Sequence, residues 1–125
     1  MIATLHTKGA VNTIDRIVDS FPADQQDQIK IQLSLVLNCI VSQQLLHRQQ
    51  GGMIPAMEIM KTIPAISNMI RDSKNYQIDN VIQTSGNLGM ISMDQYIVNL
   101  YKKGEISEET ALLSAFNPEQ MKRKL

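Results

Sequence analysis

His6, flanked by Thr4 and Thr7, is the residue whose type and position most strongly indicate chemistry in this sequence. It lies at the end of a short apolar run, and a histidine at the carboxyl end of a strand in an α/β protein can face the crevice where ligands bind. A neutral imidazole can donate a hydrogen bond to a phosphate oxygen. The same position also suits a histidine that is hydrogen-bonded to a neighbouring loop, and the residue pattern alone leaves both interpretations open.

Three further residues could carry chemistry. His47 lies in a polar stretch, which favours a solvated surface histidine, and Cys39 lies in an apolar stretch, which favours an inert core residue. Glu58 is the one acidic residue in an otherwise apolar strand. A buried carboxylate needs partners, so Glu58 is structural, paired with an arginine, or at the edge of a site. No cysteine or carboxylate lies at ligand spacing from either histidine, so we expect no metal site.

The chain contains no complete motif for nucleotide binding or hydrolysis. The loop 86–89 lacks both G-x-x-x-x-G-K-[ST] and G-x-G-x-x-G, and is therefore a poor phosphate loop. Neither a nucleophile elbow nor a paired-carboxylate motif is present. From these residues alone, the sequence predicts an α/β chain without a self-sufficient active site.

Hydrophobic periodicity predicts the elements that must position these residues. We expect a short buried strand over 2–7, helices over 9–21 and about 23–38, and strands over 39–46 and 53–60 that form a hairpin. Both faces of the second helix carry apolar residues, which predicts burial on more than one side. After Pro64 we expect short helices at 65–73, 79–84, 92–103, 107–116 and 118 onward, several of them with Ser or Asn caps.

Composition excludes several classes of protein. The 125 residues suffice for one domain, and their hydrophobic share of 43% indicates a globular chain. Twelve basic residues balance twelve acidic ones, so a basic nucleic-acid module is excluded. One cysteine cannot build a disulfide framework, and no apolar run approaches the roughly twenty residues of a membrane span. We expect a cytoplasmic protein.

Three groups of residues together resemble the type II/IV secretion ATPases. Thr4-Leu5-His6-Thr7 with 13–17 and Phe21-Pro22 is similar to the His box and following helix of that family. Residues 40–46, 58–60 and 62 are similar to its pilus retraction, or twitching motility, branch, and so is 64–72, which reads A-I-R-N-L-I-R-E in the family. Residues 82–84, 89–90, 93–94 and 104–107 complete the pattern, which covers essentially the whole chain.

The resemblance implies the C-terminal portion of a RecA-like P-loop ATPase core, with few strands, followed by a small helical subdomain. It places the core part at residues 1–62 and the helical subdomain at 63–125. In the family the P-loop, the acidic box, Walker B and the catalytic glutamate lie upstream of the His box, and these motifs are not in this chain. We therefore expect the chain alone to be inactive.

The implied function is that of a hexameric ATPase that powers type IV pilus retraction. The resemblance implies ATP and Mg²⁺ as cofactors of the full-length protein, with none tightly bound by this chain. It implies a homo-hexamer, and as partner an inner-membrane pilus platform protein at the cytoplasmic side of that membrane. Nucleic acid and direct membrane insertion are not implied.

Carried over residue by residue, the family's catalytic His-box histidine corresponds to His6, which reaches the phosphate end of the nucleotide, with Thr4 and Thr7 beside it. The retraction helix, which couples hydrolysis to retraction, corresponds to Ala65, Ile66, Asn68, Met69, Ile70, Arg71 and Asp72. Ser67 stands where the family has its first arginine, and Asp72 where it has glutamate. Arg71 is therefore expected to retain the function of this helix.

Two alternatives stay open at the level of sequence. One is a related pilus-assembly or type II secretion ATPase, although a single cysteine does not support the zinc-binding tetracysteine insertion common in that branch. The other is a non-enzymatic interaction module that binds a partner through a surface rich in methionine.

Overall fold

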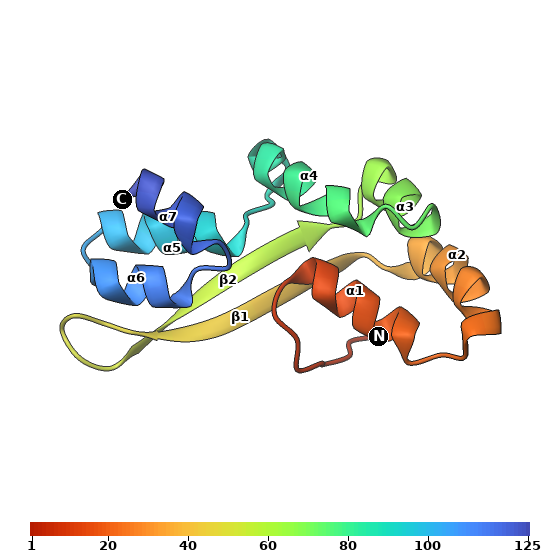
Figure 1. Cartoon of the computed structure of the whole chain (residues 1–125), viewed down its shortest axis with the longest axis horizontal. Coiled ribbons are helices and arrows are strands. Elements are labelled where there is room, and N and C mark those ends of the chain that lie inside the picture. The colour runs from red at the N-terminus through yellow and green to blue at the C-terminus, as the bar shows by residue number, and fades with distance from the viewer.

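The computed structural model describes all 125 residues, which form seven α-helices and one two-stranded sheet. The helices are α1 (Ala10–Asp19), α2 (Gln26–Val36), α3 (Pro64–Arg71), α4 (Ile78–Thr84), α5 (Met93–Lys102), α6 (Glu108–Ser114) and α7 (Pro118–Lys124), and the strands are β1 (Cys39–His47) and β2 (Met53–Lys61). The hairpin extends along the molecule, with α1 to α4 towards one end and α5 to α7 at the other (Figure 1). The predicted hairpin and the order of the helices are confirmed.

The strands β1 and β2 are antiparallel, with Cys39 opposite Lys61 and His47 opposite Met53. Because successive side chains in a strand point to opposite faces, even-numbered residues of both strands share one face. That face is buried under the helices at Ile40, Leu46, Ala56 and Met60. The opposite face is uncovered, and Val41, Leu45 and Met53 are exposed on it.

Two apolar clusters lie on the covered face of the hairpin. The first comprises Ala10, Ile14, Ile40, Met60, Ile66, Ile70, Ile78, Ile82 and Met90. The second comprises Leu46, Ala56, Met93, Ile97, Val98, Leu100, Ile106, Ala111 and Met121. Helices α3 and α4 therefore pack with α1, and the second cluster consists of residues after Met90 together with Leu46 and Ala56 of the hairpin. The predicted domain boundary between residues 62 and 63 stays a prediction.

Helix α2 is buried on one side only, so the prediction of burial on more than one side is wrong. Its buried residue is Ser34, and the Ser34 carbonyl accepts a hydrogen bond from Ser67 Oγ of α3 at 3.0 Å. Ile31, Leu35 and Val36 are exposed on the other side. No other part of this chain covers these three apolar side chains.

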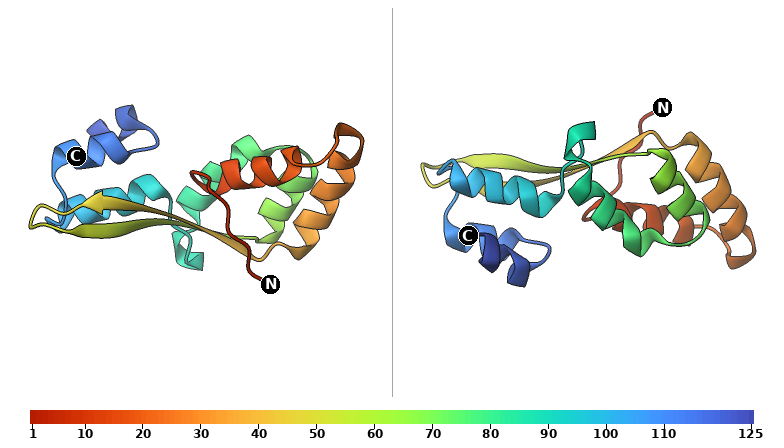
Figure 2. Two further views of the ribbon diagram at one scale, coloured as in Figure 1. Left: turned by 90° about the horizontal axis from the view of Figure 1, so that it is seen from below. Right: turned by 90° about the horizontal axis from the view of Figure 1, so that it is seen from above.

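The predicted buried strand over 2–7 is wrong. Residues 1–7 contain no regular structure, and Thr7 is the first of them that is not exposed. The chain end projects away from the helices (Figure 2). A strand is stable only when neighbouring strands satisfy its backbone groups, and the one sheet of this chain consists of β1 and β2.

The free edge of β1 predicts self-association of this chain. The 39–47 segment contains no charged residue and no proline, so it lacks the features that protect edge strands. We expect sedimentation velocity to detect dimers or larger species, and Val41→Lys to shift the chain towards monomer. Gln50→Lys adds the same charge in the exposed hairpin loop and should leave association unchanged. A wild-type chain that is strictly monomeric at high concentration would contradict this prediction.

Candidate functional site

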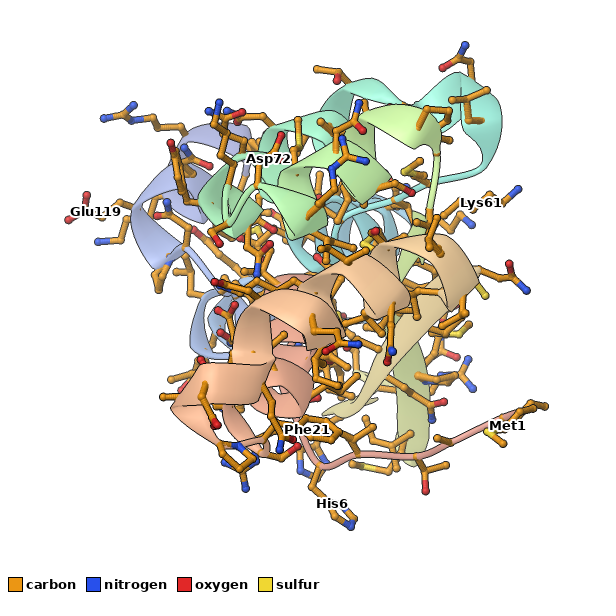
Figure 3. All side chains as sticks on the ribbon, turned by 90° about the vertical axis from the view of Figure 1, so that its right-hand side faces the viewer. Met1, His6, Phe21, Lys61, Asp72 and Glu119 are labelled. Carbon is orange, nitrogen blue, oxygen red and sulfur yellow. The ribbon has the colours of Figure 1, made fainter.

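His6 lies on the exposed segment that precedes α1. Its side chain projects away from the body of the molecule in Figure 3. Thr4 is also exposed, whereas Thr7 is half-buried and its Oγ1 lies 2.7 Å from Thr13 Oγ1. The structure thus places the three predicted nucleotide-binding residues on one accessible segment. It brings no other predicted site residue to them, and their roles stay predictions.

The segment that carries His6 is anchored to the sheet three residues further on. Gly9 N donates a hydrogen bond to Ser42 Oγ at 3.1 Å, and Ala10 N donates one to Glu58 Oε2 at 2.8 Å. Ser42 and Glu58 are directly opposite each other in the hairpin. One cross-strand pair therefore holds two consecutive amides at the start of α1.

Glu58 also holds the start of a second helix. Its Oε1 accepts a hydrogen bond from Met93 N, the first residue of α5, at 3.2 Å. The carboxylate is buried, and neither ion pair of the chain, Arg48–Glu105 or Arg71–Asp72, involves it. Of the three interpretations of Glu58, pairing with an arginine is therefore excluded. The structure assigns the carboxylate to two helix N-termini instead.

Burial controls the ionisation of this carboxylate. Desolvation raises the pKa of Glu58 above its ordinary value of 4.5, and the hydrogen bonds from Ala10 and Met93 lower it by less. The negative charges of Asp79 and Asp94 raise it further. Burial also raises the pKa of Asp79, with Asp94 as the second cause. The charge of Asp94 on α5 thus raises the pKa of a carboxyl on β2 and of another on α4.

Gly9 fits a position that admits almost no side chain. Its φ is +85°, and a Cβ there would lie 3.0 Å from the Phe116 ring and 3.1 Å from Glu58 Oε2. A cavity of about 410 Å³ beside it is lined by Lys8, Glu58, Asp79 and Phe116, among others. His6 does not line this cavity, and the first residue that does is Lys8.

The predicted retraction helix corresponds to α3. Ile66 and Ile70 are buried in the first apolar cluster, and Met69 is half-buried against it. Ala65, Asn68, Arg71 and Asp72 are exposed. The exposed side of this segment therefore carries the polar side chains of Asn68, Arg71 and Asp72.

Arg71 is held by its own helix. Its Nη2 donates to Asn68 Oδ1 at 2.6 Å, and its Nε lies 3.6 Å from Asp72 Oδ1. Ser67, which replaces the family's first arginine, packs towards α2 and donates to the Ser34 carbonyl. No hydrogen bond or ion pair links α3 to the His6 segment.

The remaining candidate residues lie at the surface. His47, the last residue of β1, is exposed, as predicted. Cys39 is also exposed, so the prediction of a core cysteine is wrong: it stands on the uncovered face of β1, where no helix packs. No group of three or more His, Cys, Asp or Glu side chains is arranged to hold a metal ion. No helix of the chain combines the length and apolar character needed to cross a bilayer.

The fold matches the C-terminal part of ATPases of known structure. The chain superimposes on the ATPase DotB of Legionella pneumophila with a TM-score of 0.70 at 17% identity, covering 86% of this chain and 29% of that one. A crystal structure of the pilus retraction motor PilT with bound ADP gives a TM-score of 0.85 at 39% identity, covering 95% of this chain and 33% of that one. No family profile matches the chain.

Sequence comparison also finds relatives among the pilus retraction and twitching motility proteins. The chain is 44% identical over 119 residues to the type IV pilus retraction ATPase PilT of Pseudomonas aeruginosa, covering 95% of this chain and 35% of the relative. It is 42% identical over 122 residues to a twitching motility protein of Neisseria gonorrhoeae, covering 97% and 33%. The chain thus spans about a third of the length of these relatives. It is homologous to the C-terminal part of the PilT-type pilus retraction ATPases, as its sequence motifs implied.

The raised pKa of Glu58 predicts a pH dependence of stability. Because the folded chain binds this proton more tightly than the unfolded chain, Glu58 contributes stability that is present below pH 4.5 and is lost as the pH rises through the raised value. The free energy of unfolding of the wild type minus that of Glu58→Gln should therefore fall between pH 4.5 and pH 7.

Urea denaturation at a series of pH values measures this difference. Glu119→Gln, which removes an exposed carboxylate of α7, is the matched control and should give a nearly constant difference. A wild-type minus Glu58→Gln difference that rises with pH would show that the hydrogen bonds outweigh desolvation and would contradict the prediction.

Proposed function

We propose that the chain is the C-terminal part of a motor ATPase that hydrolyses ATP to drive type IV pilus retraction and twitching motility. The observation that supports this most strongly is the 44% identity to a pilus retraction ATPase across 95% of the chain. The fold agrees as well, because the chain superimposes on the retraction motor structure over 95% of its length with a TM-score of 0.85. The chain alone is proposed to be inactive, because the family's phosphate-binding and Walker B segments are not in it.

In the complete motor, His6 would donate a hydrogen bond to the γ-phosphate of ATP, with Thr4 and Thr7 lining the same site. The accessibility of this segment supports the proposal, because an imidazole that is not packed into the core is free to face a ligand. The upstream segments of such a motor would hold Mg²⁺ and the other phosphates. This chain contributes the imidazole and the backbone that presents it.

The exposed residues of α3 would transmit the result of hydrolysis. Arg71 and Asp72 present charge on the surface while Ile66 and Ile70 fix the helix to the core, an arrangement suited to a docking surface on a rigid element. We propose a homo-hexamer at the cytoplasmic face of the inner membrane that acts on a pilus platform protein there.

A chimaera tests the function and the role of His6 together. In this chimaera, the chain replaces the corresponding C-terminal third of the Pseudomonas aeruginosa retraction ATPase. We expect the chimaera to hydrolyse ATP and to restore twitching to a Pseudomonas aeruginosa strain that lacks its own retraction ATPase. His6→Ala in the chimaera should lower turnover about ten- to a hundred-fold, the value of one charge-assisted hydrogen bond lost in the transition state. ADP affinity should change little, because ADP has no γ-phosphate.

His47→Ala is the control, since His47 is also exposed but stands at the far end of β1. A lowered melting temperature with unchanged turnover would move His6 from the active site to a structural role. A folded chimaera that neither hydrolyses ATP nor supports twitching would refute the proposed function.

A second substitution separates coupling from hydrolysis. Arg71→Ala in the chimaera should abolish or strongly reduce twitching while ATP turnover stays within about two-fold, because an exposed arginine away from the phosphates contributes little to folding. Arg16→Ala removes the same side chain from the exposed face of α1 and should affect neither activity. Equal losses of twitching and hydrolysis in Arg71→Ala would assign the residue to folding or to the active site.

A further inference from the structure

We propose that Glu58 is a positioning residue that links the start of α1, and with it the His6 segment, to the start of α5. Its carboxylate accepts hydrogen bonds from Ala10 N at 2.8 Å and from Met93 N at 3.2 Å, one on each oxygen. The meaning of this link for catalysis rests on the proposed function of His6. The link itself is a property of this chain.

Helix α1 depends on the sheet for its first amides. The residue before it is Gly9, which has no side chain to cap the helix, and no local side-chain cap is formed. The first free N–H groups of a helix need acceptors, and here Ser42 and Glu58 supply them from the hairpin. The direction in which the chain enters α1 is therefore fixed by Ser42 and Glu58 of the hairpin rather than by a cap within the helix.

Helix α5 has a cap of its own as well. Ser92 Oγ accepts a hydrogen bond from Gln95 N at 3.2 Å, and Glu58 accepts the one from Met93 N. A displacement of the first turn of α5 therefore acts on a carboxylate that is already bound to α1. Glu58 is 4% exposed, so water has little access to replace either bond.

A second connection joins the same two parts. Asp94, in the first turn of α5, accepts hydrogen bonds from Phe116 N at 2.7 Å and Asn117 N at 2.9 Å. The Phe116 ring in turn packs beside Gly9. Two connections thus join the α5–α7 helices to the segment that follows His6. One is the pair of Glu58 hydrogen bonds to Met93 and Ala10, and the other is the packing of the Phe116 ring beside Gly9. The charged groups around Glu58 are Asp79, Asp94 and Lys8.

Hydrogen exchange in the 125-residue chain tests the link. Ser92→Ala removes the local cap of α5 and should loosen its first turn. With Glu58 present, we expect the exchange rate of the Ala10 amide to rise several-fold, up to about five-fold if the loss of the cap is fully transmitted. The amides of Ile70 and Ile82, buried in the first cluster, report global unfolding, and their exchange should rise by a similar factor in every variant that loses one cap.

Ser107→Ala is a closely matched control. Ser107 caps α6 by the same interaction, accepting a hydrogen bond from Thr110 N at 3.1 Å, but Glu58 bonds to the starts of α1 and α5 and not to α6. This substitution should leave Ala10 exchange unchanged. An unchanged Ala10 rate in Ser92→Ala, or an equal increase in Ser107→Ala, would overturn the proposal.

The double mutant cycle separates positioning from mere stabilisation. In a Glu58→Gln background, one oxygen remains and cannot serve both amides, so Ser92→Ala should alter Ala10 exchange much less than it does with Glu58 present. Glu58→Asp, which keeps the charge but is one methylene shorter, serves where Glu58→Gln does not fold. A Ser92→Ala effect of undiminished size in these backgrounds would refute the link. The measurement uses neither nucleotide nor motor, so its outcome is independent of whether the chimaera retracts pili.

Discussion

The structure depends on a hairpin of which one face is covered. Both apolar clusters lie on that face, the first over Ile40 and Met60 and the second over Leu46 and Ala56. The polar pair Ser42 and Glu58 stands between them in the register of the strands. Helix N-termini have amides that the helix cannot satisfy, so the starts of α1 and α5 lie over this polar pair. The gap between the two clusters is thus also the place where helices from each end meet.

A buried carboxylate without a cation needs compensation. Two N–H donors and the positive ends of two helix dipoles supply it at Glu58. The compensation is incomplete, since burial still raises the pKa of Glu58 and the charges of Asp79 and Asp94 add to the effect. An uncharged apolar residue at this position would avoid the desolvation but would leave two buried amides without acceptors. A carboxylate is suited to this position because two helix N-termini meet there and each of its oxygens accepts one of their amides.

Local signals predicted most of the fold. Ser92, Ser107 and Asn117 were identifiable as caps because a cap and its amide lie within three residues. The hairpin was predictable from alternation and turn residues. The pattern also singled out Glu58, since an acidic residue in an apolar strand is conspicuous. It could not identify the partners, because Ala10 and Met93 lie 48 and 35 residues away.

The errors have a common cause. Residues 2–7, Cys39 and the outer side of α2 are apolar enough to be buried, but burial requires a neighbour, and a residue pattern does not say which neighbours the chain itself contains. In this chain those surfaces face solvent. Ser42 was missed for a different reason: a serine in a strand carries no signal until the backbone amide it accepts from, 33 residues away, is known.

The position of His6 is consequently fixed only through the residues that follow it, at Gly9 and Ala10. Upstream of Gly9, the hydrogen bonds are the Thr7–Thr13 hydroxyl pair and the bond from Asn12 Nδ2 to the Lys8 carbonyl, both within six residues. The first bonds to the sheet are those of Gly9 and Ala10. A change in the helices at the far end of the hairpin can therefore reach His6 through this anchor. Residues 2–7 pair with neither β1 nor β2, so no sheet fixes the chain on the other side of His6.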